Sequence, residues 1–130
     1  MELATRMAER AVGLTAPNPP VGVIIVKDGT ILSRGWTQPG GSPHAEVHAI
    51  NQVRNKSLLK GSTMYSTLEP CSHEGKNPAC VDSIIRYKFK DVILSQKDRN
   101  RLVNGKGIRK LRSKGIKVTQ VNFGNNISKF

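Results

Sequence analysis

The sequence has few cysteines, few acidic residues and no long apolar run. Only two of its 130 residues are cysteines, which excludes a small domain held together by several disulfides. No apolar stretch approaches the roughly 20 residues that span a bilayer, and the opening MELATRMAER lacks the apolar core of a signal peptide. We therefore expect a cytoplasmic protein without a membrane anchor, in which the cysteines serve metal binding or catalysis.

The length and composition fit one globular domain. A chain of 130 residues can bury one sizeable core and is too short for two full catalytic domains. Hydrophobic residues make up only 37% of the chain, but Val, Ile and Leu recur in short runs bounded by Gly, Pro and Asn. We expect a single domain over residues 1–130 with one active site.

Acidic residues are scarcest in the last third of the chain. The whole sequence has 21 Lys and Arg against nine Asp and Glu, a net charge of +12. Residues 86–130 hold 13 of these basic residues and only Asp91 and Asp98, a net +11, which leaves +1 for the rest. This asymmetry predicts either an anionic partner, such as a nucleic acid, a phosphorylated metabolite or an acidic surface, or simply a solvated lysine-rich surface.

The hydrophobic patterns predict helices and strands in alternation. Helical spacing is expected over residues 2–14, and prolines end it. Two strands within residues 21–36 are joined at Asp28-Gly29, a dipeptide that suits a tight hairpin. A helix over 44–55 is entered through Ser42 and Pro43, with Ser42 as its cap. The remaining elements are a strand (62–70), a helix capped by Asn77 (77–87), a strand (91–96), a helix (104–115) and a strand (116–121).

The order α-β-β-α-β-α-β-α-β implies a mixed sheet. Strands separated by a helical crossover normally become parallel neighbours, whereas the hairpin strands must be antiparallel. We therefore expect an α/β fold, a three-layer α/β/α sandwich with a mixed five-stranded sheet and helices on both faces.

Three residues of the sequence form a candidate metal site. His44, Cys71 and Cys80 are ligand types that zinc prefers, and three protein ligands leave the fourth tetrahedral position for water, as in catalytic sites. Two thiolates balance the charge of the ion, and zinc lowers the pKa of such a water to roughly 7. Cys80 also lies at a predicted helix N-terminus, where the dipole favours a thiolate.

Glu46 is the candidate general acid and base. It lies two residues after His44, and zinc nucleobase deaminases combine His-x-Glu with Pro-Cys and a second Cys in this way. One geometric objection arises, because positions two apart on an ideal helix point about 200° away from each other. A competing interpretation, the metalloprotease helix with His44 and His48 four apart, requires Glu directly after the first His, where this chain has Ala45.

Three segments together resemble a known family. HAEVHAI, TLEPCSHEGKNPAC and APNPPVGVIIVKDG closely resemble the deaminase domain of the riboflavin-biosynthesis deaminase/reductase, over about residues 1–120. Eight residues separate the two cysteines here, whereas tRNA adenosine deaminases have CxxC. The resemblance implies a cytidine deaminase-like fold and the hydrolytic deamination of 2,5-diamino-6-ribosylamino-4(3H)-pyrimidinone 5′-phosphate to 5-amino-6-ribosylamino-2,4(1H,3H)-pyrimidinedione 5′-phosphate.

The resemblance also implies roles for single residues. The zinc ligands of the family fall on His44, Cys71 and Cys80, and its proton shuttle falls on Glu46. Substrate contacts are implied for three further residues, Asn18, His73 and Lys76.

The chain departs from the family in two places. It has Asp98-Arg99-Asn100-Arg101 where the family usually shows a DPNP-like segment, which affects the expected substrate contacts. No reductase domain follows within the 130 residues, so we expect a separate reductase, a lost one, or a domain expressed in isolation.

Two alternatives to this function stay open. One is a deaminase of another nucleobase, nucleotide or tRNA base that uses the basic last third of the chain, although the cysteine spacing argues against tRNA. The other is a catalytically silent zinc-binding module, against which Glu46 argues because only catalysis needs it. The expected partner is a small phosphorylated pyrimidine, and a homo-oligomer is also open.

Overall fold

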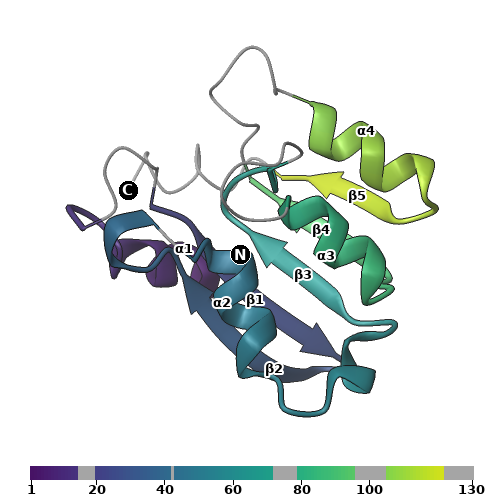
Figure 1. Cartoon of the computed structure of the whole chain (residues 1–130), viewed down its shortest axis with the longest axis horizontal. Coiled ribbons are helices and arrows are strands. Elements are labelled where there is room, and N and C mark those ends of the chain that lie inside the picture. Colours follow the sequence, from purple (N-terminus) through teal and green to yellow (C-terminus); the bar gives the residue numbers. More distant parts are fainter. Residues whose placement is uncertain (15–19, 42, 72–78, 96–104, 122–130) are drawn as a thin grey trace.

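The computed structural model describes residues 1–14, 20–41, 43–71, 79–95 and 105–121. Helices and strands follow one another in the order that the sequence predicts, with two additional single turns of 3-10 helix, η1 and η2 (Figure 1). The elements are α1 (Glu2–Glu9), β1 (Gly22–Lys27), β2 (Thr30–Trp36), η1 (Pro39–Gly41), α2 (Ala45–Gln52), η2 (Lys56–Leu59), β3 (Thr63–Ser66), α3 (Cys80–Arg86), β4 (Asp91–Leu94), α4 (Lys106–Ser113) and β5 (Lys117–Gln120).

The five strands form one mixed sheet in the order β2-β1-β3-β4-β5. β1 is antiparallel to both β2 and β3, whereas β3, β4 and β5 are parallel. The hairpin between β1 and β2 closes with Lys27 opposite Thr30, and the two turn residues, Asp28 and Gly29, both have positive φ angles (50° and 77°). The predicted turn and the predicted mixed sheet are confirmed.

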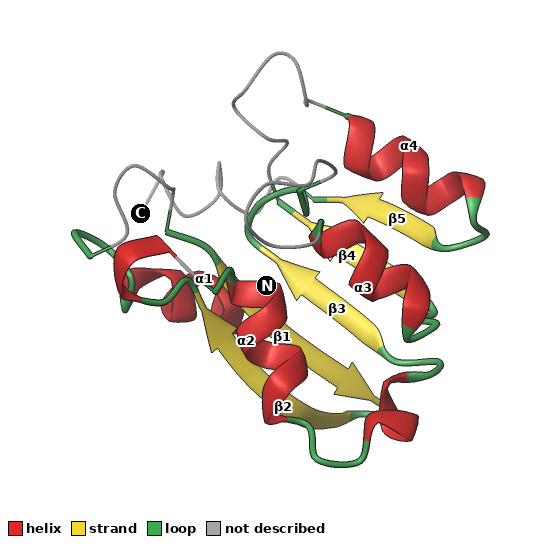
Figure 2. Cartoon of the chain, viewed as in Figure 1, coloured by secondary structure: helices red, strands yellow, loops and turns green. Residues whose placement is uncertain are grey.

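Helices cover both faces of the sheet, as predicted (Figure 2). Alternate residues of β1 point to opposite sides, which divides the core in two. Val23 and Ile25, both fully buried, belong to the larger cluster with apolar residues of α2, α3 and α4. Ile24 lies in a smaller cluster with Ala4 and Met7 of α1. The fold is therefore a three-layer sandwich, with α1 on one face and the other three α-helices on the opposite face.

Several element ends differ from the sequence predictions. His44 is the N-cap of α2, and Ala79 is the N-cap of α3, so the predictions that Ser42 and Asn77 cap these helices are wrong. In both cases the residue before the helix has an extended backbone, so the first helical turn begins only at the next residue, Ala45 or Cys80. Ser42 and Asn77 themselves lie outside the described residues.

The helices and the last three strands are shorter than predicted, and α1 and β3 are shortened most. After α1 ends at Glu9, backbone hydrogen bonds span only three residues, and Gly13 has a left-handed φ of 81°, so the helix does not continue to Leu14. β3 ends at Ser66 rather than at Pro70. The Ser66 hydroxyl donates to the carbonyl of Leu68 (2.7 Å) and turns the chain away from the sheet.

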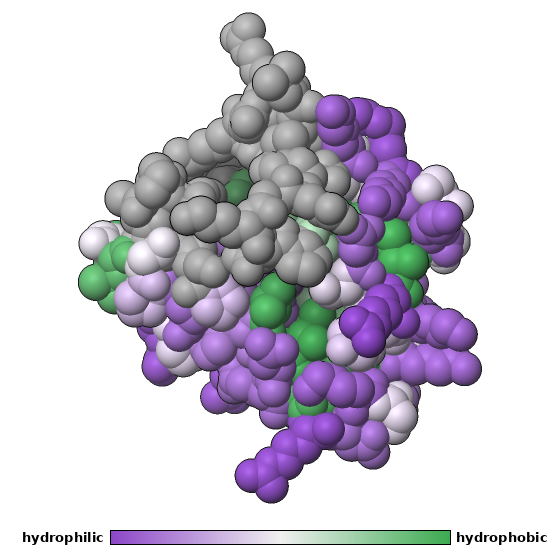
Figure 3. Space-filling model, viewed as in Figure 1, coloured by the Kyte–Doolittle hydropathy of each residue, from purple (hydrophilic) through white to green (hydrophobic). Residues whose placement is uncertain are grey.

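The exposed surface of the last third of the described chain is basic. Lys106, Arg109, Arg112 and Lys114 on and after α4 are exposed, and α4 is hydrophilic in Figure 3. Lys110 forms an ion pair with Asp82 of α3 (2.7 Å). No helix in the described part of the chain is long and apolar enough to cross a membrane.

Gly35 allows α2 to pack directly against β2. A Cβ atom at this position would lie 2.5 Å from the carbonyl oxygen of Ala45 and 2.8 Å from the Cβ of Ala49. Both neighbours belong to α2, the helix that directly follows His44. The close approach of α2 to β2 therefore also fixes the position of His44 relative to the sheet. A larger residue at position 35 would push the helix away.

We predict that Gly35→Ala lowers the free energy of unfolding by about 3 kcal/mol, because the added methyl group would clash with α2 and force the helix backbone to move. Gly61→Ala is the matched control, since a Cβ there meets no atom within 4 Å and only the positive φ of 78° is strained, a cost of about 1 kcal/mol. Urea unfolding measures both, and equal losses in the two variants would contradict the packing argument.

Candidate metal centre

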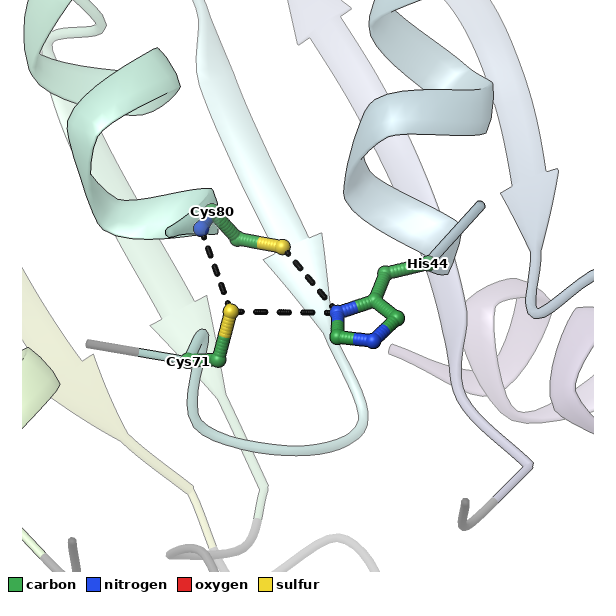
Figure 4. Close-up of side chains that lie close together, drawn as sticks. All are labelled: His44, Cys71 and Cys80. Carbon is green, nitrogen blue, oxygen red and sulfur yellow. Dashed lines mark hydrogen bonds between the residues drawn. The ribbon is translucent and has the colours of Figure 1, made fainter. Parts of the chain in front are cut away.

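The three predicted ligands come together from three different elements. His44 directly precedes α2, Cys71 lies in the connection between β3 and α3, and Cys80 is the first residue of α3. Figure 4 shows the two sulfur atoms and the imidazole pointing toward one another. Their ligand atoms all lie within 4.8 Å of one another, and among the described residues they form the one group of His, Cys, Asp and Glu side chains with this arrangement.

The distances within the group fit a tetrahedral metal ion. Nδ1 of His44 lies 3.7 Å from Sγ of Cys71 and 3.4 Å from Sγ of Cys80. A tetrahedral zinc site, with Zn–S near 2.3 Å and Zn–N near 2.0–2.1 Å, requires a sulfur-to-nitrogen separation of about 3.6 Å. Both nitrogen-to-sulfur distances therefore suit such an ion, and Nδ1 is the imidazole nitrogen that faces the two sulfur atoms.

Hydrogen bonds shift the pKa values of the two cysteines in opposite directions. The backbone N–H of Cys80 donates to Sγ of Cys71 (3.1 Å). Hydrogen bonding from the Cys80 thiol, and to a lesser degree from His44, lowers the pKa of Cys71 to about 4, although burial opposes this. The pKa of Cys80 is raised by the same thiol contact and by burial, and the pKa of His44 is raised by its contact with Cys71. The contact between the two sulfur atoms thus favours the thiolate at Cys71 and the thiol at Cys80.

Glu46 is buried beside the ligands. Its side chain is 4% exposed, and burial raises the pKa of its carboxyl group, with the negative charge of Cys71 as the second cause. Its contact with the Cys80 thiol also shows that the carboxyl group faces the ligand group. The geometric objection to this pair does not apply, because His44 has extended backbone angles (φ −65°, ψ 161°) and lies outside the helix.

His48 does not join the ligand group. Its Nδ1 accepts a hydrogen bond from the backbone N–H of Trp36 (3.3 Å) and lies 3.0 Å from Nε2 of Gln38. The Trp36 ring packs against the imidazole edge-on, at 4.8 Å between centroids. His48 therefore tethers α2 to the end of β2, and the protease arrangement with His44 and His48 as joint ligands is not formed.

The predicted substrate contacts and the departing segment are not described by the structure. Asn18, His73 and Lys76 lie outside the described residues, as does the segment from Asp98 to Arg101.

The sequence pattern assigns no role to one buried acidic residue near the ligands, Glu69. Its carboxylate is 4% exposed and accepts hydrogen bonds from the backbone N–H groups of Gly105 (2.8 Å) and Ile108 (3.2 Å). The one signal in the sequence was an acidic residue two positions before Cys71, at the end of an apolar strand. Because residues 62–70 are predicted as one strand, the sequence pattern indicates no role for this carboxylate.

Comparison with known proteins shows the family to which the chain belongs. The family model described as the cytidine and deoxycytidylate deaminase zinc-binding region matches residues 1–96. The chain belongs to this deaminase family. The matched residues include all three of the clustered ligands and Glu46.

Within the deaminase family, the chain is similar to riboflavin-biosynthesis proteins. The riboflavin biosynthesis protein RibD of Aquifex aeolicus is 48% identical over 118 residues, which are 91% of this chain and 33% of that protein. The diaminohydroxyphosphoribosylamino-pyrimidine deaminase of Buchnera aphidicola is 46% identical over 91% of this chain and 79% of its own length. The chain thus spans about a third of the RibD protein, and the resemblance to its deaminase domain is confirmed.

A solved structure shows the same fold. The diaminohydroxyphosphoribosylaminopyrimidine deaminase/5-amino-6-(5-phosphoribosylamino)uracil reductase of Thermotoga maritima superimposes with a TM-score of 0.90 at 41% identity. The match covers 99% of this chain and 37% of that protein. The predicted cytidine deaminase-like sandwich is therefore confirmed.

We predict that His44→Ala abolishes tight binding of added Zn²⁺, whereas His48→Ala retains it, because only His44 shares the ligand group with the cysteines. Equilibrium dialysis of the metal-free variants, followed by elemental analysis, measures the bound ion. Retention of one ion per chain by His44→Ala would remove this residue from the ligand set.

Proposed function

We propose that the chain is a zinc-dependent deaminase of riboflavin biosynthesis. Its substrate is 2,5-diamino-6-ribosylamino-4(3H)-pyrimidinone 5′-phosphate, from which it releases ammonia by hydrolysis to give 5-amino-6-ribosylamino-2,4(1H,3H)-pyrimidinedione 5′-phosphate. The observation that carries the proposal is the group of His44, Cys71 and Cys80 within 4.8 Å, with the buried Glu46 carboxyl group beside it. The names of the similar proteins support the substrate.

Zinc is the metal that the donor set favours. Two thiols and an imidazole select zinc over magnesium or calcium, which prefer oxygen ligands. His44, Cys71 and Cys80 would hold the ion, and two thiolates would balance its charge. When bound, zinc supplies a Lewis acid that lowers the pKa of a water molecule to roughly 7.

Glu46 would move the protons of the reaction. Its buried carboxyl group has a raised pKa, which suits a group that must both accept and return a proton near neutral pH. It would take a proton from the attacking water and deliver it to the amino group that leaves as ammonia. Glu46 lies in the first turn of α2, two residues after His44, and would thus stand beside the reacting carbon without being a ligand.

The substrate contacts remain part of the proposal. We assign Asn18 to the pyrimidine base, and His73 and Lys76 to the pyrimidine or its ribose phosphate. Lys76 would supply a positive charge for a phosphate oxygen. The segment Asp98-Arg99-Asn100-Arg101 would alter local contacts relative to the family.

The organisation of the protein is also part of the proposal. We expect residues 1–130 to form one deaminase domain, like the part of the Thermotoga deaminase/reductase that they match. A cytoplasmic location and a homo-oligomer stay predictions. The alternatives, a deaminase of another nucleobase, nucleotide or tRNA base and a catalytically silent zinc-binding module, are outcomes of the assays below.

Glu46→Gln should retain zinc and the folded state but lose about 10²–10⁴-fold in turnover, because the amide preserves shape and cannot transfer a proton. Glu9→Gln, on the exposed end of α1, is the matched control and should keep full activity. Ammonia release under saturating substrate measures both variants. Near-normal turnover by Glu46→Gln would exclude the assigned role, and an inactive wild-type protein with one zinc would favour the silent module.

The substrate class is tested by ammonia release from a panel of compounds. We expect turnover of the phosphorylated diaminopyrimidine, and little or none of dCMP, cytidine or tRNA. Lys76→Ala should weaken binding of the phosphorylated substrate by about 1.5–3 kcal/mol more than binding of its dephosphorylated form, as is typical of a hydrogen bond to a charged group. Efficient tRNA deamination beside an inert diaminopyrimidine would overturn the proposed function.

A further inference from the structure

We propose that Glu69 is a positioning residue for the metal centre: its carboxylate binds the start of α4 and thereby holds the loop that carries Cys71. The inference rests on the proposed zinc site. The loop, residues 67–71, links β3 to the first sulfur ligand, and Glu69 lies at its centre.

Each oxygen of the Glu69 carboxylate has a backbone partner on α4. Oε1 accepts from the N–H of Gly105 at 2.8 Å, and Oε2 accepts from the N–H of Ile108 at 3.2 Å, and both hydrogen bonds are buried. These N–H groups belong to the helix start, where the helix itself provides no acceptor. The carboxylate therefore completes the N-terminus of α4 from a segment about 36 residues earlier in the chain.

The sequence of α4 gives it no cap of its own. Its N-cap is Gly105, which is left-handed (φ 85°) and has no side chain, and the first turn contains no acidic residue. Lys106 and Arg109 instead add positive charge near the positive end of the helix dipole. A negative charge at this point must come from elsewhere in the fold, and Glu69 supplies it.

The residue after Glu69 is also in close contact with α4. A Cβ atom at Gly107 would lie 2.5 Å from the carbonyl oxygen of Pro70 and 3.1 Å from Oε2 of Glu69. Only a glycine lets the first turn of the helix approach this closely. The segment directly before Cys71 is therefore packed against α4 by its backbone as well as by the carboxylate.

Cys71 is held from its other side by α3. The backbone N–H of Val81 donates to the carbonyl of Cys71 (3.1 Å), and the N–H of Cys80 donates to its sulfur (3.1 Å). At the beginning of the loop, the N–H of Gly22 in β1 donates to the Thr67 hydroxyl (3.1 Å). The Glu69 carboxylate fixes the middle of the loop, so its loss would let the chain on the β3 side of Cys71 move.

Glu69→Gln tests this role with little change in size. The amide keeps one accepting oxygen but turns an N–H toward the second backbone N–H, and the negative charge is lost. We expect the zinc affinity to fall by about 10–100-fold, the range for groups that orient metal ligands. Competition with a chromophoric chelator at fixed pH measures the affinity of the metal-free protein for Zn²⁺.

Lys110→Met is the matched control. It removes the ion pair with Asp82, which also joins α4 to α3 but is partly exposed and does not involve residues 67–71. We expect its zinc affinity to stay within about twofold of wild type, since a partly exposed ion pair contributes little. Gly107→Ala is a second test variant: it pushes α4 away from Pro70 while the Glu69 carboxylate remains, and should also weaken zinc binding.

A second measurement does not depend on the metal. In the metal-free protein, iodoacetamide modification of Cys71, followed by peptide mass spectrometry, should be faster in Glu69→Gln than in wild type or Lys110→Met. The buried Cys80 should show a smaller change. A wild-type protein that binds no zinc, combined with this acceleration at Cys71, would remove the proposed function and retain the part of the inference in which Glu69 holds the Cys71 loop.

The inference is overturned if Glu69→Gln and Gly107→Ala both bind zinc within about twofold of wild type and leave the modification of Cys71 unchanged, even if they unfold more easily. Glu69 would then stabilise α4 alone. If Glu69→Gln does not fold, normal zinc affinity and normal Cys71 modification in Gly107→Ala would overturn the inference in the same way.

Discussion

The hydrogen bonds from the first turn of α3 to Cys71 hold the two sulfur ligands side by side. The Cys71 sulfur and carbonyl both accept from this turn, so the loop after β3 and the start of α3 behave as one unit. The imidazole reaches the same point from the opposite side, because His44 is extended before α2 begins. Cys71 and Cys80 lie on the connection between the parallel strands β3 and β4, whereas His44 is placed by α2, which packs against β2.

Burial and charge have opposite effects within this group. Removing thiols and a carboxyl group from water favours their neutral forms, whereas hydrogen bonds and a divalent ion favour thiolates. The pKa of Cys71 is therefore lowered, whereas the pKa values of Cys80 and Glu46 are raised. A cation is what allows both sulfur atoms to carry charge in so small a space.

Much of this fold could be predicted from local sequence signals. The hairpin follows from Asp28-Gly29, and the element order follows from alternating hydrophobic runs, because these signals act between near neighbours. The ligand set was readable because the chemistry of zinc limits the residue types. Helix starts were less predictable: the cap of α3 is Ala79, which has no capping side chain, and Glu69 binds residues 36 and 39 positions later. Contacts over such separations leave no periodic pattern in the sequence.

The two outer strands of the sheet present different surfaces to another chain. β5 is four residues long, and its exposed Lys117 adds charge to that edge, two features that disfavour pairing with a further strand. β2 is seven residues long and carries Ile31, which is 42% exposed. By its length, β2 would therefore offer a continuing sheet more backbone hydrogen-bonding positions than β5.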